Sequence, residues 1–385
     1  MMTCSLRAKT LPLAVVLLGL GLITCSPDAP SPQSGTVHSR EHDFTVTTLV
    51  TGLDHPWSLA FLPDGRMLVT ERAGRLRIVQ DGKLLPQPVH GLPAIEEHGQ
   101  GGLMDVALHP RYGETGWLYL SYAARGPGGV GTEVLRAKLM GDRLKDQQVI
   151  FRMEPKRRGG RHFGSRLLFD RQGFLYVTLG ERGEQDHAQR LDDHLGKVVR
   201  LYDDGRVPPD NPFVGRPDAR PEIYTYGHRN VQGAALHPTT GLVWTHEFGP
   251  QGGDELNVLR PGVNYGWPVI TYGVEYVIGT KIGEGTHKEG MAQPIYHWVP
   301  SISPSGMVFY TADKFPRWRG DLFLGGLSAQ CLIRLRLDGE KVVEEERMLE
   351  GIGRVRDVRI GPDGYLYLLT DATHGALLRL EPVQG

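Results

Sequence analysis

Net charge, cysteine and long apolar runs are all scarce in this sequence. Its 385 residues carry 43 Lys and Arg against 44 Asp and Glu, a formal net charge of −1. A nucleic-acid-binding domain carries a clustered basic surface, so this balance argues against nucleic acid as a partner. With three cysteines and no Cys-x-x-Cys pair, the chain cannot build a disulfide framework, and a zinc-ribbon or thioredoxin-type site is excluded.

One apolar run stands out at the N-terminus, Leu11–Ile23, preceded by Arg7 and Lys9. About thirteen apolar residues are too few for a comfortable membrane span and fit the hydrophobic region of an export signal. We therefore predict a signal peptide over residues 1–25, with a membrane anchor or a buried helix as the alternative. Export would place the protein in the periplasm or the cell envelope.

Cys25 closes this run in the sequence Leu-Ile-Thr-Cys, which resembles the cleavage box of a bacterial lipoprotein. On this interpretation Cys25 is the lipid-anchored first residue of the mature protein. Ordinary cleavage a few residues later is the alternative. In either case residues 26–42 are predicted to form a flexible tether, and residues 43–385 the folded domain.

Glycine and proline are abundant. The 51 glycines and 27 prolines make up about a fifth of the chain, against a usual share of roughly 12%. This content excludes a long-helix protein, and the lack of a three-residue period excludes collagen. The hydrophobic share of 40% excludes a disordered chain. A turn-rich, mostly β globular protein remains.

A module recurs along the chain: an alternating apolar run, a turn, and a second alternating apolar run. In the first and last copies the turn is Pro-Asp-Gly, in which Pro presets φ and Gly accepts positive φ, a hairpin signal. Six copies are present, the fifth being weaker, and they span Trp57–Glu71, Met104–Tyr122, Ser165–Glu181, Gly233–Gly249, Ser305–Leu327 and Val355–Asp371.

The spacing of the copies predicts the fold. Successive modules start about 47 to 72 residues apart, which suits four-stranded blades with loop insertions. We predict an all-β fold, a six-bladed β-propeller of four-stranded antiparallel blades over residues 43–385. Two packed β-sandwiches are the alternative. In a propeller the loops at one end converge on the central axis, where a ligand site is expected.

Polar residues gather in the loops that enter these modules. Because the loops occupy analogous positions, Gln100, His162, Arg229 with Asn230, and Arg354 with Arg356 should lie at the same end of the ring. Arginine binds carboxylates through a planar fork, and three arginines without matching acids imply an anionic ligand. A histidine among them should have its pKa lowered by the cations, and would be able to act as a base.

Four stretches carry a resemblance to a known family: YGHRNVQG (Tyr226–Gly233), GPQGGDELN (Gly249–Asn257), NYGWP (Asn264–Pro268) and GRVRDVRIGPDGYLYLLTD (Gly353–Asp371). In this order, on a six-module chain, they resemble the soluble aldose sugar dehydrogenases that depend on pyrroloquinoline quinone (PQQ) and calcium. The resemblance extends from about Thr45 to Leu380. It implies oxidation of aldose sugars to lactones, with an electron acceptor that the sequence does not identify.

The resemblance implies a role for each matching position. His162 would be the general base that takes the proton of the anomeric hydroxyl, while the hydride passes to the quinone. The implied cofactor-binding residues are Gln100, Arg229, Asn230, Arg354, Arg356 and Tyr276. Gly249 and Pro250 match the backbone carbonyls that hold the activating calcium. Glu255, with the backbone oxygen of Tyr265, matches a further calcium site.

Two positions depart from the family pattern. Ser328 stands where members commonly place a lysine on the quinone, so a weaker hold on the cofactor is expected. Glu181 stands where the glucose-oxidising branch has an aspartate beside the catalytic histidine, and the longer carboxylate could still orient His162. Both differences favour the broader aldose branch over strict glucose specificity.

Two other functions compete with this interpretation. A calcium-dependent lactonase-type propeller needs carboxylates and Asn around an axial metal, whereas this sequence supplies Arg and amides. A non-enzymatic propeller that binds carbohydrate or protein would have an eroded cofactor pocket, which Ser328 would suit, but His162 and the three arginines argue against it. The preferred sugar, and the choice between monomer and homodimer, stay open at this point.

Overall fold

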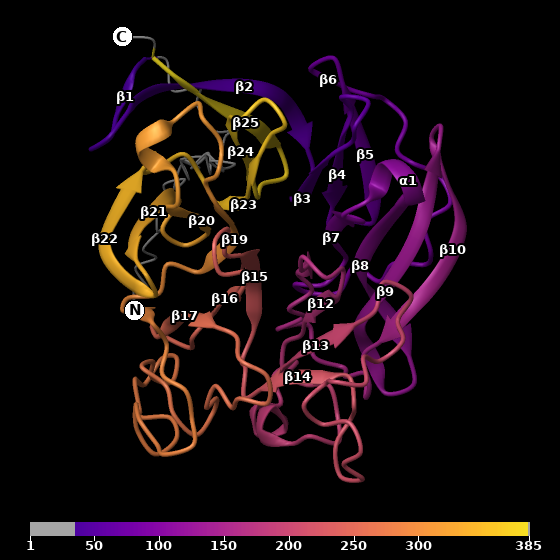
Figure 1. Cartoon of the computed structure of the whole chain (residues 1–385), viewed down its shortest axis with the longest axis vertical. Coiled ribbons are helices and arrows are strands. Elements are labelled where there is room, and N and C mark those ends of the chain that lie inside the picture. Colours follow the sequence, from indigo (N-terminus) through magenta and orange to yellow (C-terminus); the bar gives the residue numbers. More distant parts are fainter. Residues whose placement is uncertain (1–34, 384–385) are drawn as a thin grey trace, which may run out of the picture.

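The computed structural model describes residues 35–383, and these form six antiparallel sheets arranged around a centre (Figure 1). Helical structure in this range is limited to three short segments, α1 (Tyr112–Thr115), η1 (Gln185–Gln189) and η2 (Pro316–Trp318). The predicted six-bladed β-propeller is confirmed, and the alternative of two sandwiches is wrong.

The first three blades follow one another along the chain, each with its strands in sequence order. The first contains β3 (Pro56–Phe61), β4 (Met67–Glu71), β5 (Arg75–Gln80) and β6 (Lys83–Leu84). The second contains β7 (Leu103–Leu108), β8 (Trp117–Gly126), β9 (Gly129–Met140) and β10 (Arg143–Arg152). The third contains β11 (Leu167–Phe169), β12 (Leu175–Thr178), β13 (Lys197–Leu201) and β14 (Ile223–Tyr226).

The next two blades repeat this order, and the last borrows strands from the other end of the chain. The fourth contains β15 (Val231–Leu236), β16 (Val243–Glu247), β17 (Asp254–Val258) and β18 (Tyr296–Trp298). The fifth contains β19 (Pro304–Phe309), β20 (Leu322–Gly326), β21 (Cys331–Asp338) and β22 (Lys341–Met348). The sixth contains β23 (Val355–Ile360), β24 (Leu366–Thr370), β25 (Gly375–Pro382), β2 (Asp43–Leu53) and β1 (Val37–His38).

The ring closes because the two ends of the chain share the sixth blade. The N-terminal β2 pairs with the C-terminal β25, with Thr47 opposite Arg379 and Val46 opposite Leu380. The six inner strands, β3, β7, β11, β15, β19 and β23, contact one another in cyclic order. The pairing of β2 with β25 thus joins the two ends of the chain in one sheet and covers the edge of β25.

The N-terminal predictions need one correction. Cys25 and the predicted signal lie outside the described residues. Within the predicted tether of residues 26–42, however, β1 pairs with β2, with Val37 opposite Phe44, and His42 packs on the rings of Phe315 and Trp318. Residues 37–42 therefore belong to the propeller. No helix within residues 35–383 is long and apolar enough to cross a membrane.

Apolar packing lies between neighbouring blades, while the innermost layer is polar. Trp244 of the fourth blade packs edge-on against Phe309 of the fifth, and both are buried. Near the axis the buried Arg166 guanidinium lies 3.1 Å from both Asp105 and Asp357. This cluster connects the second, third and sixth blades. Removing one of its members would leave a buried charge without a partner, which is costly.

Candidate active site

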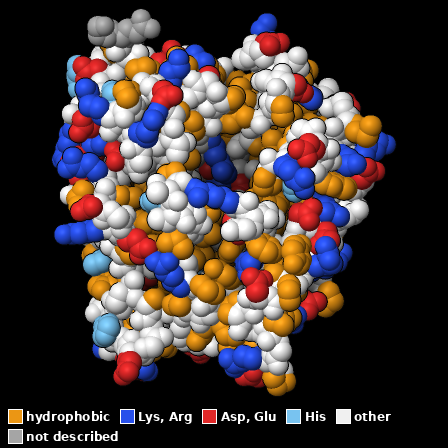
Figure 2. All heavy atoms as spheres, in the orientation of Figure 1, with side chains coloured by type: hydrophobic (Ala, Val, Ile, Leu, Met, Phe, Trp, Pro, Cys, Tyr) orange, Lys and Arg blue, Asp and Glu red, His pale blue; other side chains and the backbone are white. Residues whose placement is uncertain are grey.

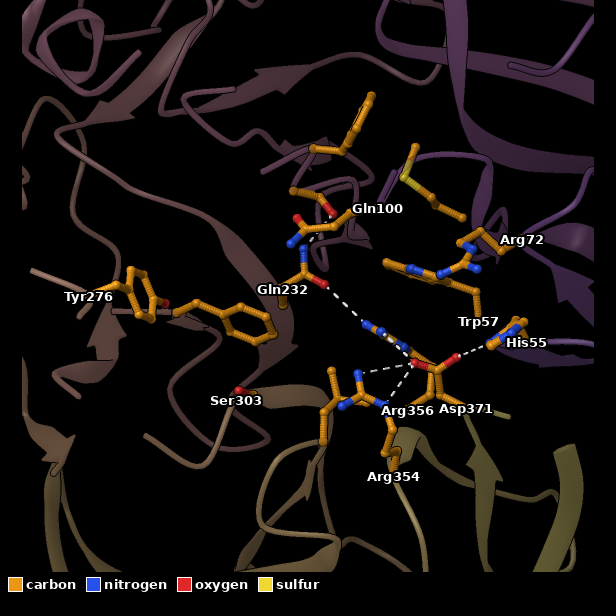
Figure 3. Close-up of a pocket in the computed structure, with 15 residues that line it drawn as sticks. His55, Trp57, Arg72, Gln100, Gln232, Tyr276, Ser303, Arg354, Arg356 and Asp371 are labelled. Atoms are coloured by element: carbon orange, nitrogen blue, oxygen red, sulfur yellow. Dashed lines mark hydrogen bonds and ion pairs between the residues drawn. The ribbon is translucent and has the colours of Figure 1, made fainter. Parts of the chain in front are cut away.

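A cavity of about 300 Å³ opens at one end of the ring, lined by residues from all six blades (Figure 3). Figure 2, in the orientation of Figure 1, shows a hollow at the centre of the ring with Lys or Arg side chains visible inside it. The wall combines cationic, amide and aromatic groups, including Trp57, Arg72, Gln100, Gln232, Tyr276 and Arg356. The predicted residues Gln100, Tyr276, Arg354 and Arg356 therefore share one cavity.

His162 lies directly behind this wall. It is buried, its backbone N–H donates to Gln100 Oε1 at 2.8 Å, and the next residue, Phe163, lines the cavity. Its Nδ1 is 2.8 Å from Glu181 Oε1. Since an ionised carboxylate only accepts hydrogen bonds, Nδ1 carries the proton and Nε2 is left as the basic nitrogen.

The surroundings of His162 favour its neutral form. Burial lowers the pKa of His162, the hydrogen bond to Glu181 opposes that change, and the positive charge of Arg229 adds to it, so the pKa falls below its ordinary value. The structure thus brings the predicted orienting acid Glu181 next to the predicted base. A neutral histidine with a fixed tautomer can take a proton at Nε2.

Arg182 holds the loop that carries His162. Its buried guanidinium donates to the carbonyls of Arg161 and Gly159 and, at 3.3 Å, to that of Val130, and it lies over the Phe163 ring, 3.4 Å from the centroid. His162 itself has a φ of 56°, a left-handed conformation rarely adopted by residues other than glycine. Such backbone strain is typical of functional sites, and it persists because contacts like these fix the loop.

The arginine pair does have a matching acid, contrary to the sequence-based expectation. Asp371 Oδ2 lies 3.1 Å from Arg356 Nη2 and 3.4 Å from Arg354 Nη2, and its Oδ1 lies 2.8 Å from His55 Nδ1 (Figure 3). The physical reason is that Asp371, the last residue of the sixth module, follows β24 directly and faces the two arginines from that strand end. One of the two guanidinium charges remains uncompensated by Asp371.

Arg229 and Asn230 are buried next to the cavity and carry orphan donors. Arg229 Nη1 donates to the Gly249 carbonyl at 2.7 Å, and Asn230 Oδ1 accepts from the Gly164 N–H at 3.1 Å. Within residues 35–383, neither Arg229 Nε nor Asn230 Nδ2 has a hydrogen-bond partner. A buried donor without a partner is costly, so these atoms fit a ligand rich in acceptors.

Ser328 lies apart from the other predicted cofactor residues. It lines an adjoining hollow of about 520 Å³ together with Pro250, and its hydroxyl donates to the Ser301 carbonyl at 3.1 Å. Tyr276 and Ser303 line both the hollow and the main cavity. The structure therefore does not bring Ser328 to the wall that holds Arg354 and Arg356.

Two of the four predicted calcium ligands line a second, much smaller cavity of about 10 Å³, room for a single water-sized species. Glu255, Gly249 and the buried Glu247 line it, while Pro250 and Tyr265 do not. Burial and the negative charge of Glu247 hold the pKa of Glu255 well above its usual range. Two carboxylates this close suit a cation, although Arg229 already donates to the Gly249 carbonyl.

The described residues contain no cluster of three or more His, Cys, Asp and Glu side chains able to hold a metal. Any calcium at this place would therefore depend on backbone carbonyls, as the sequence resemblance implies. Tyr265 is buried by stacking on His228, with ring centroids 4.8 Å apart, and its hydroxyl donates to the Val258 carbonyl at 2.7 Å.

Comparison with known proteins decides the family. Residues 53–379 match the family described as Glucose / Sorbosone dehydrogenase. The chain belongs to this family. It is 47% identical over 344 residues to aldose sugar dehydrogenase YliI of Escherichia coli strain K12, covering 88% of this chain and 92% of that protein. The predicted family and the predicted enzyme class, a sugar dehydrogenase, are confirmed.

Solved structures of this family agree with the fold. A crystal structure of a glucose dehydrogenase is 50% identical, with a TM-score of 0.85, and covers 87% of this chain and 99% of that one. The PQQ-bound form of an aldose sugar dehydrogenase from Streptomyces coelicolor is 30% identical, with a TM-score of 0.71, and covers 88% of this dehydrogenase and 98% of that chain.

Sequence reasoning missed several residues of this dehydrogenase's cavity, above all His55, Trp57, Arg72 and Asp371. A signal for Asp371 was present. In four blades an acid stands at or just after the end of the second strand, and each of these acids binds the loop before an inner strand; they are Glu71, Glu181, Glu247 and Asp371. Aligning the modules on this acid would have placed Asp371 beside Glu181 as a site residue.

Proposed function

We propose that this dehydrogenase oxidises the anomeric carbon of aldose sugars to lactones, with PQQ and Ca²⁺ as cofactors and His162 as the general base. The observation that carries the proposal is the His162–Glu181 pair at 2.8 Å beside a cavity walled by Arg354 and Arg356. A base with a fixed tautomer next to a cationic wall suits proton removal from a neutral sugar beside an anionic cofactor.

The cavity fits a planar polycarboxylate such as PQQ. Arg354 and Arg356 offer two guanidinium groups against the single charge of Asp371, and Arg72 adds a third cation. The orphan donors of Arg229 and Asn230 would bind further acceptor atoms of the cofactor. When bound, PQQ supplies the acceptor for the hydride of the sugar.

The chain's own residues handle the proton. Glu181 accepts the hydrogen bond from His162 Nδ1 and thereby fixes the ring and its tautomer. The anomeric hydroxyl donates its proton to Nε2, and the imidazolium that forms is stabilised by the Glu181 carboxylate. Arg182 and Gln100 keep the loop in place during this transfer, because both bind the peptide group between Arg161 and His162.

Calcium would be held near Gly249 and Glu255, where it would polarise the cofactor as a Lewis acid and neutralise the buried carboxylates. The substrate class is proposed to be broad. Ser328 supplies no cation, and it lies in the adjoining hollow with Pro250 and Tyr276. That hollow leaves room beside Tyr276 for sugars larger than glucose.

The test uses the purified protein with PQQ and Ca²⁺, and follows dye reduction with a panel of aldoses. Dye reduction by several aldoses, dependent on added PQQ, is expected. If no sugar reduces the dye and absorbance shows no PQQ binding, the proposed function is wrong. PQQ binding without turnover would instead favour a binding protein that has kept the pocket.

The predicted export forms part of the proposal. Residues 1–25 would direct the protein to the periplasm or cell envelope, and Cys25 would carry the lipid. Mass spectrometry of the mature N-terminus distinguishes a lipid-modified Cys25 from cleavage a few residues later. An unprocessed N-terminus starting at Met1 would contradict both.

A further inference from the structure

His55 is a second histidine at the candidate active site, and it belongs to the cavity wall. It lies on the loop between β2 and β3 with a φ of 45°. Its backbone N–H donates to the Ala372 carbonyl at 2.8 Å, and its carbonyl accepts from the Arg72 N–H at 3.1 Å. These two hydrogen bonds, to residues just after β24 and β4, hold His55 in the left-handed region. Residues other than glycine rarely adopt that conformation.

The carboxylate of Asp371 links this histidine to the arginine pair. Its Oδ1 binds His55 Nδ1 at 2.8 Å, and its Oδ2 faces Arg356 and Arg354 (Figure 3). Burial alone would raise the pKa of Asp371, but Arg356, the hydrogen bond from His55 and the charge of Arg354 together lower it well below its usual range. Asp371 therefore stays ionised and offsets one of the two guanidinium charges.

The geometry repeats that of two other histidine–carboxylate pairs. His162 and His228 also place Nδ1 2.8 Å from a carboxylate, those of Glu181 and Glu247. The His228 ring is fully buried and its Nε2 is 2.9 Å from the Thr225 hydroxyl, so that copy is structural. His55 instead lines the cavity with its side chain 29% exposed, which leaves Nε2 for a ligand.

We propose that His55 is a further binding residue for the anionic cofactor: Asp371 holds Nδ1, and Nε2 donates a hydrogen bond to a carboxylate of the bound quinone. This inference rests on the proposed function. A histidine that donates from both ring nitrogens is an imidazolium, so in the complex His55 adds a second uncompensated positive charge to the cluster formed by Arg354, Arg356 and Asp371. A polycarboxylate therefore meets more positive charge than the arginine pair alone supplies.

The other charged groups near His55 are arginines and a paired acid. Arg72 lies on the strand end that contacts its carbonyl, and Arg354 and Arg356 are arginines, which stay charged. Asp54, the preceding residue, is paired with Arg75 at 2.7 Å. His162 also lies close to the cavity, so a variant of His55 is needed to separate the two histidines.

The experiment measures the dissociation constant of PQQ for the full protein at constant Ca²⁺ and constant pH. The test variant is His55→Asn, because Asn tolerates positive φ and its amide can keep the contact with Asp371. The matched control is His90→Asn, an exposed histidine that does not line the cavity. Circular dichroism and thermal unfolding establish that both variants fold.

In His55→Asn, we expect PQQ affinity to fall on the order of tenfold relative to the wild type, the size of one hydrogen bond to a charged group. His90→Asn should keep the wild-type affinity. His55→Lys, which keeps a positive charge at this position, should bind PQQ about as tightly as the wild type. His162 is unchanged in all of these proteins, so differences between them report on residue 55.

The outcomes separate the two claims. If the wild type binds no PQQ, the proposed function fails. If it binds PQQ but His55→Asn shows the wild-type affinity, the role of His55 is wrong while the proposed function stands. Loss of binding in both His55→Asn and His55→Lys, with both variants folded, would also contradict a charge-based role for this histidine.

Discussion

His162 Nδ1 lies 2.8 Å from Glu181 Oε1, and both side chains are buried beside the cavity. The two residues are 19 positions apart, and His228 and Glu247 form an equivalent pair with the same separation and distance in the next blade. The propeller thus carries the same histidine–carboxylate arrangement twice, with the His228 copy fully buried and the His162 copy beside the cavity.

Replacing the proposed base, His162, should abolish turnover while PQQ still binds to the site. In His162→Ala we expect kcat to fall about 10²- to 10⁴-fold, the usual contribution of a general base, while PQQ affinity changes little. Steady-state kinetics at saturating PQQ, together with absorbance titration, measure the two quantities. Lost PQQ affinity with unchanged turnover per bound quinone would mean that His162 is a binding residue only.

The pH profile should depend on Glu181. Turnover needs neutral His162, so kcat falls as the pH drops through the pKa of that histidine, which burial sets below its ordinary value despite Glu181. Glu181→Gln removes a group that raises this pKa, so the acid limb should move to lower pH while kcat decreases. Glu181→Asp should give a smaller change. If the acid limb of the pH profile stays in place in Glu181→Gln, the assignment of His162 as a base oriented by Glu181 is wrong.

Removing the Arg182 guanidinium should loosen the loop of His162. Arg182→Met leaves the carbonyls of Arg161 and Gly159 without their donor, and we expect about 1–3 kcal/mol less stability with a fall in kcat larger than any change in KM. The control is Arg190→Met, an exposed arginine. Denaturant unfolding and kinetics measure both effects. A variant as stable and active as the control would show that the clamp is dispensable.

Calcium should stabilise the folded protein and support activity. The small cavity between Glu247 and Glu255 gathers negative charge that a divalent cation offsets. Chelation should lower the midpoint of thermal unfolding and reduce activity, and added Ca²⁺ should restore both. Glu255→Gln should reduce the calcium-dependent shift. If neither the midpoint of thermal unfolding nor the activity responds to a chelator, the protein does not depend on calcium.

The blades could be predicted because their signals are local. The turn at Pro63–Gly65 and its copy at Pro362–Gly364 have glycines with φ near 88° and 83°, and alternating apolar runs flank both turns. Long-range relations were not accessible in the same way. Nothing local pairs β2 with β25, and the contact of His55 with Asp371 joins residues 316 positions apart.

The same distinction between local signals and long-range contacts applies to the candidate site. His162, Gln100, Arg354 and Arg356 were found because each lies in a loop that enters a module, and the ring brings such loops together. The separation of Ser328 from that group could not be foreseen, because it depends on how the turn after β20 packs against Ser301. Motif position placed these residues at one end of the ring, whereas side-chain contacts decide which of them share a cavity.

The central claim is that PQQ bound to this protein oxidises an aldose. Its most direct test is a single-turnover measurement with PQQ-loaded protein, Ca²⁺ and an aldose, in the absence of any electron acceptor. We expect one equivalent of lactone per bound quinone, with the absorbance of the reduced cofactor appearing at the same rate. Bound PQQ that stays oxidised, with no lactone formed from any aldose of the panel, would contradict the account.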